Sequence, residues 1–383
     1  MADDPRYREA LGYLAPGYFR ITHEDLVSPA AESPGSWMDA EGVAWDADRV
    51  LRSVRNVQEA LPSASEVTVV IDRWPPRMDA DGDGKLDADR KAEFATLCAE
   101  LVGILGRLDK PVAAIEVTDG LDAVYEARPL ADDQPSEALE LAEIISLAAV
   151  SIRDVWPDAP LAGPGARALD NAPFHRGLAL ALSFGGFAAY SFGLDPAHGG
   201  ESGIGGDGGA MPTPGAVIRE IGAIVALQPQ RMDTVLSRFG PSGQAGMRAA
   251  AWDVWLTVEA VAAGCDAVAG WCDLADDGGR IGPGFGIRAS GHAMHLANKM
   301  LAGKLLADCT VAGGGDWLRA LAVRDGTTGP MVLLVNGGPG PREVALDGDG
   351  WSVSYEVTDE GIREVPLAAG SVTLRGFGVA IVR

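Results

Sequence analysis

One segment of the sequence carries oxygen-bearing side chains at the spacing of a calcium-binding loop. From Asp79 to Asp87 it reads DADGDGKLD, which places carboxylates at positions 1, 3, 5 and 9 of an EF-hand-like loop. Gly84 stands at position 6, where such a loop turns sharply. Hard oxygen ligands at this spacing suit Ca²⁺. The predicted metal ligands are the side chains of Asp79, Asp81, Asp83 and Asp87 and the carbonyl of Lys85.

The last ligand position departs from the EF-hand pattern. Arg90 stands at position 12, where an EF-hand has a bidentate glutamate, so Asp89 or Glu93 would have to take its place. The alternative interpretation is a solvated acidic turn in which Asp87 caps the following helix. We favour calcium. No organic cofactor is predicted, because the GxGxxG spacing at Gly203–Gly208 is followed by prolines where a nucleotide-binding motif requires a helix.

Elements of two kinds alternate along most of the chain. From Tyr18 to about Leu306 short apolar runs alternate with amphipathic ones, as in β/α units around a parallel sheet. Strands are predicted at Tyr18–Thr22, Val67–Asp72, Ala113–Val117, Leu161–Gly163, Phe187–Ser191, Thr234–Ser237 and Ala267–Cys272. Helices are predicted at Ala47–Leu61, Ala88–Leu108, Ser136–Trp156, Asn171–Leu182, Gly215–Leu227, Gln244–Ala262 and Ser290–Leu306. This α/β pattern favours a (β/α)8 TIM-type barrel with one strand missing over an open doubly wound sheet.

The missing strand is predicted to be the first. Asp3–Leu14 has the pattern of the helix after strand one, and no strand is encoded before it. The edges around Tyr18–Ile21 and Ala267–Cys272 would then carry unpaired N–H and C=O groups. We expect the gap to be filled by a segment from elsewhere in the chain, by a partner subunit in a homo-oligomer joined through the open barrel edges, or by upstream residues.

The pattern changes after Leu306 to short alternating strands separated by Gly, Pro and Asp turns. These strands are predicted at Met331–Val335, Arg342–Leu346, Trp351–Val357, Ser371–Leu374 and Val379–Val382. The chain is therefore predicted to divide into a barrel over residues 1–306 and an all-β domain over residues 307–383.

The segment at the fourth barrel strand resembles a known catalytic motif. Ile115–Tyr125 reads IEVTDGLDAVY, which is similar without a gap to the WEIWNEPDLVY segment of clan A retaining glycoside hydrolases, particularly glycoside hydrolase family 39. The resemblance implies that an Asn orients the sugar 2-hydroxyl and that the next Glu is the general acid/base. Here Asp119 stands at the Asn position and Gly120 at the Glu position.

The resemblance continues at the seventh strand and beyond. Val235–Gly240 looks like the VWLTEFG segment that holds the nucleophilic Glu, and Arg238 occupies that place. Retaining hydrolysis needs two carboxyl groups about 5 to 5.5 Å apart, so the resemblance implies that the catalytic pair is lost. The C-terminal strands resemble the small β-sandwich that packs against such barrels. The likeness covers nearly the whole chain.

The resemblance predicts a carbohydrate-binding or structural relative of these enzymes without retaining hydrolase activity. The expected carbohydrate-binding residues are Arg20, Trp74, Asp119, Tyr190, Arg238 and Trp271. Two other interpretations stay open. The first is hydrolysis by relocated carboxylates, with Glu116 and Asp119 as fallback catalytic candidates. The second is a scaffold whose barrel mouth meets another protein. For Arg238 the alternative to a sugar ligand is a structural ion pair with Asp119 and Glu116.

Composition limits the partners. With 47% hydrophobic residues the chain has enough apolar material for a full core. A formal net charge of −23 opposes binding to nucleic acid and to anionic membrane surfaces. The N-terminus has no apolar signal segment and the four cysteines form no CxxC pair, which favours a cytoplasmic protein. Upstream residues with a signal peptide would change that expectation.

Overall fold

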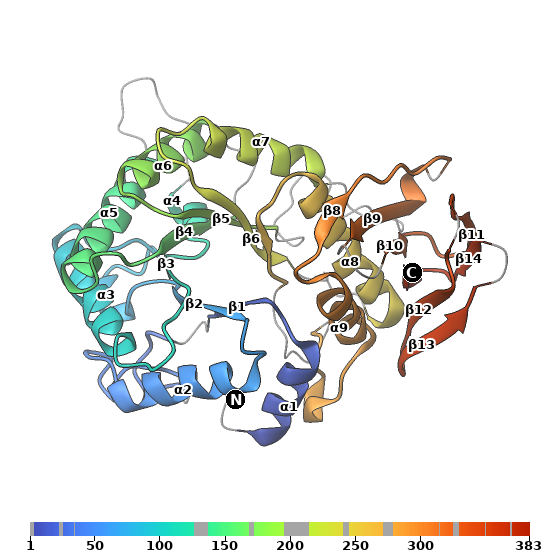
Figure 1. Cartoon of the computed structure of the whole chain (residues 1–383). Coiled ribbons are helices and arrows are strands. Elements are labelled where there is room, and N and C mark those ends of the chain that lie inside the picture. The colour runs from blue at the N-terminus through green and yellow to red at the C-terminus, as the bar shows by residue number, and fades with distance from the viewer. Residues whose placement is uncertain are drawn as a thin grey trace.

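The computed structural model describes residues 4–22, 26–33, 35–125, 137–167, 172–194, 214–239, 245–270, 279–313, 315–324, 329–348, 350–367 and 370–383. Within these ranges the chain forms a parallel (β/α) barrel followed by antiparallel sheets. Figure 1 shows the barrel in blue to yellow and the C-terminal sheets in orange and red.

The barrel is a parallel sheet whose seven described strands pair in chain order. They are β1 (Tyr18–Ile21), β2 (Glu66–Ile71), β3 (Ala114–Val117), β4 (Leu161–Ala166), β5 (Ala189–Leu194), β6 (Asp233–Phe239) and β7 (Ala267–Val268). In the described ranges no strand lies between β1 and β7. The prediction of a TIM-type barrel is therefore confirmed, and the described residues hold seven of its strands. How the gap is filled stays a prediction.

Helices form the outer layer of the barrel (Figure 1). They are α1 (Pro5–Leu14), α2 (Ala47–Ala60), α3 (Lys91–Leu105), α4 (Asp122–Tyr125), α5 (Glu137–Val155), α6 (Ala172–Phe184), α7 (Gly215–Ala226), α8 (Gly246–Ala262) and α9 (Ala289–Leu301). The first two begin at capping aspartates: Asp4 accepts the Arg6 N–H, and Asp46 accepts the Arg49 N–H. None of the described helices is both long and apolar enough to span a bilayer.

Burial along the sheet distinguishes its middle from its ends. All six residues of β4 are buried, and in β2 only Glu66 is exposed, because helices cover these strands outside and side chains fill the barrel inside. Every residue of β1 and β7 is only half-buried. The strands beside the missing strand are thus the least covered part of the sheet.

Helix α1 packs against α9 at the β1 end of the barrel. The Tyr13 hydroxyl and His292 Nδ1 lie 2.8 Å apart, and the Tyr13 ring stacks on His295 with ring centroids 4.0 Å apart. The Asn298 side chain donates to the Leu14 carbonyl at 2.9 Å. Both histidines of α9 therefore act as packing groups between the two helices.

The C-terminal strands form a six-stranded antiparallel sheet of order β13-β12-β15-β10-β9-β8 and a two-stranded sheet of β11 and β14. They are β8 (Leu305–Ala307), β9 (Leu318–Arg324), β10 (Pro330–Asn336), β11 (Arg342–Ala345), β12 (Val353–Thr358), β13 (Gly361–Pro366), β14 (Ser371–Leu374) and β15 (Val379–Val382). Val332 and Leu334 pack in a small core with the two-stranded sheet, whereas Met331, Leu333 and Val335 join the barrel core. Because alternate side chains of β10 point to opposite faces of the sheet, one face packs on the two-stranded sheet as a β-sandwich and the other packs on the barrel.

Several predicted boundaries were wrong. The last helix was predicted to reach Leu306, but α9 ends at Leu301, and Leu305 already pairs with Arg324 of β9. Gly303, with φ of +71°, breaks the helix. The sheet therefore begins two residues before the division expected after residue 306. Strands β9 and β13 were not predicted.

The contact between α1 and α9 makes stability depend on pH. Burial lowers the pKa of His292 and of His295 below 6.5. A neighbouring positive charge lowers each pKa a little further. The neighbours are His295 for His292 and Lys299 for His295, while the Tyr13 carbonyl partly opposes the shift of His295. The folded state then binds fewer protons than the unfolded state, so we expect the free energy of unfolding to fall as pH drops below 6.5.

Urea unfolding in buffers of about pH 5 and about pH 7.5 tests this expectation. The His292→Gln/His295→Gln variant should lose part of the pH dependence that the wild type shows. Tyr13→Phe should cost about 1 kcal/mol at the higher pH, because it removes one hydrogen bond. An identical pH dependence in wild type and double variant would contradict the assignment.

Candidate functional site

A buried ion pair crosses the inside of the barrel. Arg20 Nε on β1 donates to Glu116 Oε2 on β3 at 2.7 Å, and Arg20 Nη1 donates to the Ser237 carbonyl on β6 at 2.7 Å. Ser191 on β5 donates to Glu116 Oε1 at 2.6 Å. The Arg20 side chain is 5% exposed and that of Glu116 is not exposed. One guanidinium therefore connects strands on opposite sides of the barrel.

Both oxygens of Glu116 are thus occupied beneath the barrel mouth, by which we mean the C-terminal ends of the strands. Burial and the charge of Asp119 raise the pKa of Glu116, and Arg20 opposes them. Burial alone would lower the pKa of Arg20, but Glu116 and Asp119 outweigh it and the pKa is raised. Both side-chain oxygens of Glu116, a fallback catalytic candidate, are therefore engaged by Arg20 and Ser191, and a catalytic role for it stays a prediction.

Asp119, after β3, lies among three guanidinium groups. Its Oδ2 accepts from Arg167 Nη2 at 3.2 Å and is 4.0 Å from Arg238 Nη1, and its Oδ1 is 3.8 Å from Arg20 Nη2. The Asp119 side chain is 3% exposed. The structure thus brings three predicted site residues together, Arg20, Asp119 and Arg238, and it supports the ion-pair interpretation of Arg238.

Arg167 occupies the space next to Gly120. It follows β4, and its backbone N–H donates to Asp122 Oδ2 at 2.7 Å. A Cβ atom built at Gly120 would overlap the Arg167 side chain, and the φ of Gly120 is +73°. Any larger residue at position 120 therefore requires both a strained backbone and displacement of Arg167.

Sequence reasoning missed Arg167 and Ser191 as site residues. The strand that the structure shows as β4 was predicted to end at Gly163, so Arg167 did not count as a residue at a strand's C-terminal end. The signal that could have found it is its position, because the residue after a barrel strand faces the mouth.

Several polar atoms at the mouth are buried and lack a hydrogen-bond partner among the described residues. They are Arg20 Nη2, Arg167 Nε, Asp72 Oδ1 and Asp119 Oδ1. Two are donors and two are acceptors. A hydroxyl group or a water molecule can accept from an arginine and donate to a carboxylate at once, whereas an anion or a cation can satisfy only one kind. The mouth therefore holds unpartnered donors and unpartnered acceptors side by side.

Asp72 is a buried carboxyl group at the end of β2. Burial, together with the charge of Asp119, raises its pKa to about 7, while Arg73 acts in the opposite direction. Arg73 Nε lies 3.6 Å from Asp72 Oδ2, but the Arg73 side chain is half exposed. Asp72 is therefore a buried carboxyl group of the mouth whose pKa lies near neutral pH.

Two of the three aromatic residues expected to stack on sugar rings are described, and both are buried. Trp74 is buried, with edge-to-face contacts to Phe94 and Tyr125. Tyr190 is fully buried, and its hydroxyl lies 2.7 Å from His175 Nδ1 on α6, outside the sheet. Both side chains belong to the hydrophobic core, and a sugar-stacking role for them stays a prediction. Trp271 lies outside the described residues.

The predicted calcium loop folds between two 3-10 helices, η1 (Pro76–Met78) and η2 (Ala88–Arg90). Carboxylate oxygens of Asp79, Asp81 and Asp83 all lie within 4.8 Å of one another. The Gly84 N–H donates to Asp79 Oδ2 at 3.0 Å, and Gly84 has φ of +87°, as the sharp turn requires. The arrangement fits a cation with oxygen ligands, and calcium stays a prediction.

The residues beyond the loop are arranged differently from an EF-hand. Arg90, at the last ligand position, donates to Glu93 at 2.9 Å, and Glu93 also pairs with Arg77. Glu93 is therefore engaged by two arginines and does not replace the missing glutamate. Asp89 is the remaining substitute.

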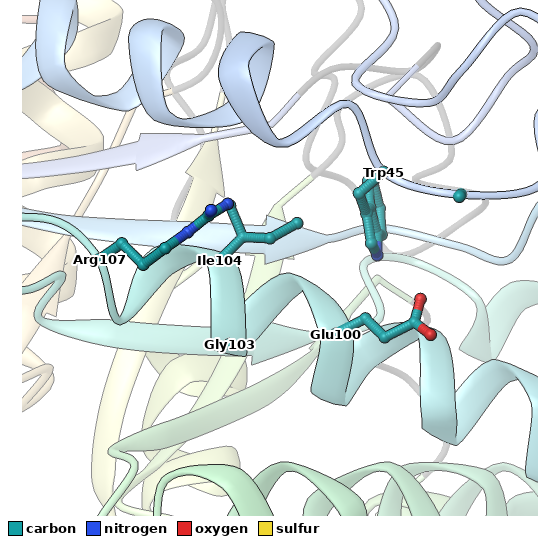
Figure 2. Close-up of a pocket in the computed structure, with 6 residues that line it drawn as sticks. Trp45, Glu100, Gly103, Ile104 and Arg107 are labelled. Atoms are coloured by element: carbon teal, nitrogen blue, oxygen red, sulfur yellow. The ribbon is translucent and has the colours of Figure 1, made fainter.

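A surface hollow lies on the outside of the barrel. Figure 2 shows Glu100, Ile104 and Arg107 on α3 and just after it, with Trp45 on the facing loop. Trp45 is fixed by a hydrogen bond from its indole N–H to the Leu97 carbonyl at 2.8 Å. The hollow contains none of the predicted site residues, so it carries no part of the candidate site.

The raised pKa of Asp72 predicts an opposite pH effect from that of the histidines. The pKa of Asp72 is about 7 in the folded state, against 3.8 for an ordinary aspartate, so its contribution to stability is full below pH 3.8 and is lost as pH rises through 7. We expect Asp72→Asn to stabilise the protein at about pH 8, relative to about pH 5, by on the order of 2 kcal/mol. Urea unfolding measures this, with Asp109→Asn, an exposed carboxylate, as control. An equal effect at both pH values would contradict the assignment.

Calcium binding to the folded protein alone should raise its melting temperature. Stabilisation of about 2.7 kcal/mol is expected at a calcium concentration of about 100 times Kd. Differential scanning calorimetry in millimolar Ca²⁺ and in EDTA measures the shift, and Asp81→Ala/Asp83→Ala should abolish it. If Ca²⁺ and EDTA give the same melting temperature in the wild type, the loop is only an acidic turn.

No protein-family model and no curated protein sequence matches this chain. Solved structures do match its fold. A GH30 endoxylanase from Clostridium papyrosolvens C71 has a TM-score of 0.67 at 13% identity, over 99% of this chain and 92% of that one. A monomeric beta-xylosidase from Caulobacter crescentus CB15 has a TM-score of 0.66 at 13% identity, over 99% of this chain and 92% of that one.

A GH51 arabinofuranosidase from Xanthomonas axonopodis pv. citri has a TM-score of 0.62 at 11% identity, over 98% of this chain and 88% of that one. Identities this low show a shared fold and no more. The chain has the architecture of these clan A glycoside hydrolases, a TIM-type barrel with a C-terminal β-sandwich.

Proposed function

We propose that this chain is a glycoside-hydrolase-like protein whose barrel mouth binds carbohydrate without hydrolysing it by the retaining mechanism. The observation that carries the proposal is the position of Arg167, whose side chain fills the space beside Gly120. In the resemblance to family 39, that space belongs to the general acid/base. A guanidinium in its place cannot donate a proton at neutral pH.

The other half of the catalytic pair is also replaced in this proposal. Arg238 stands at the nucleophile position at the end of β6, with Nη1 4.0 Å from Asp119 Oδ2. A guanidinium cannot form the glycosyl ester that retaining hydrolysis requires. Asp119, the carboxylate between the two positions, serves three arginines as counterion and is almost fully buried.

The unpartnered polar atoms of the mouth support carbohydrate as the ligand. Arg20 Nη2 and Asp119 Oδ1 are a donor and an acceptor 3.8 Å apart, and both lack hydrogen bonds among the described residues. A sugar hydroxyl or a water that a sugar retains can bridge them. The names of the structural neighbours, an endoxylanase and a beta-xylosidase, make xylo-oligosaccharides the first probes.

A second candidate is hydrolysis by relocated carboxylates. The observation that favours it is Asp72, whose raised pKa suits a general acid. An inverting mechanism would need a partner carboxylate about 6.5 to 9.5 Å away. Asp72→Asn separates the candidates, because it should abolish such hydrolysis and leave a purely binding protein able to bind. A protein scaffold would bind no sugar in either form.

We expect xylo-oligosaccharides to bind and aryl xylosides to show no turnover above background. Titration calorimetry measures binding, and chromatography after long incubation measures products. Asp119→Asn should weaken binding at least tenfold, because Arg20, Arg167 and Arg238 lose their shared counterion. Glu100→Gln, in the outer hollow, is the matched control and should bind as the wild type does.

Turnover in the wild type that survives Glu116→Gln and Asp119→Asn would refute the assignment of the catalytic positions. Turnover lost in Asp72→Asn would establish the relocated mechanism instead. Absence of binding to a panel of oligosaccharides would remove carbohydrate as the ligand.

Replacing Gly120 and Arg238 by glutamate tests the family positions directly. Gly120→Glu/Arg238→Glu should remain inactive and lose stability, because Arg167 occupies the space of the new side chain at residue 120. Adding Arg167→Ala removes that overlap, so measurable hydrolysis is expected only in the triple variant. Activity in the double variant equal to that of the triple variant would show that Arg167 does not block the position.

A further inference from the structure

An edge strand of the C-terminal sheet exposes large apolar side chains. β8 ends the six-stranded sheet and, among the described strands, pairs with β9 alone. Leu305 is 68% exposed and Leu306 is 58% exposed. Leu306 faces the same side of the sheet as Val323, and Leu305 faces the other side. Such an edge is a template for pairing with another strand, and folded proteins usually cover it.

The segment around β8 is complementary to itself in an antiparallel arrangement. From Lys304 to Asp308 it reads KLLAD. A two-fold axis through Leu306 places Leu306 opposite its own copy, with Lys304 opposite Asp308 on either side. On the other face Leu305 meets Ala307, a large side chain against a small one. In this register, therefore, every charged side chain faces one of opposite charge, and the large side chain of Leu305 faces a small one.

The Lys304 ammonium group can serve more than one acceptor. It has other interactions within its own chain, and an ammonium group has three donors. Asp308 is exposed and follows the strand directly. The ion pairs would flank the leucine pair on the face that carries Leu306.

We propose that β8 is an interface through which two copies of this chain pair antiparallel, joining their six-stranded sheets into one. The interface differs from the gap between β1 and β7, where the barrel edges are parallel to each other. The paired segment is short, so the dimer is of the weak class, with Kd in the range of about 1 to 100 µM.

Charge reversal tests the register. Sedimentation equilibrium from about 1 to about 200 µM should show a monomer–dimer equilibrium in the wild type. Lys304→Glu turns both ion pairs into like-charge pairs, and we expect it to raise Kd about tenfold. Lys304→Glu/Asp308→Lys restores the opposite charges and should return Kd to the wild-type value. Lys299→Glu, the same charge change on α9, is the matched control.

Crosslinking tests whether the two-fold axis of the dimer passes through Leu306. In Leu306→Cys the two thiols would lie directly opposite, at Cα separations of about 4.5 to 5.5 Å, which a disulfide can span. Oxidation should give a covalent dimer. The native Cys309 is exposed on the same segment, but in this register its two copies stand about 20 Å apart, so the wild type should not crosslink.

A monomer at every concentration would overturn the proposal. A dimer whose Kd does not change in Lys304→Glu, and which Leu306→Cys fails to crosslink, would overturn it as well and would place the interface elsewhere, including at the barrel gap. The substituted residues are on the surface, and circular dichroism checks that each variant is folded.

Discussion

The rest of the barrel mouth depends on the buried ion pair between Arg20 and Glu116. Arg20 is on β1, which pairs with only one neighbour in the described sheet, and its guanidinium reaches both β3 and β6. A side chain thus connects strands across the barrel where backbone pairing is missing. Removing one partner of such a pair leaves an uncompensated buried charge and costs about 3 to 5 kcal/mol.

That requirement supports the proposal that the mouth binds carbohydrate without hydrolysing it. Glu116 is held by Arg20 and Ser191, and Asp119 balances Arg20, Arg167 and Arg238. A general acid or a nucleophile must be accessible and able to change its charge during the reaction. A carboxylate that acts as a counterion in a buried network is neither accessible to a substrate nor free to change its charge. Asp72, near the edge of the network and beside a half-exposed arginine, is the exception.

The sequence predicted the barrel and its missing strand because periodic apolar runs mark strands wherever turns separate them. It misplaced the start of β5, because Phe187 belongs to the turn that ends α6, where its N–H bonds to the Leu182 carbonyl. It ended β4 too early at a proline, although the strand continues through an irregular pairing to Ala166. Arg167 was missed for that reason. The core position of Tyr190 could not be predicted, because a strand buried on both faces has no polar alternation to show which residues point inward.

A crystal structure of the protein soaked in a xylo-oligosaccharide tests the central claim most directly. The account predicts an uncleaved sugar at the ends of β3 and β6, with the Arg167 guanidinium still beside Gly120 and a hydroxyl or water between Arg20 and Asp119. A cleaved product, or a covalent sugar ester on Asp72 or Asp119, would contradict it.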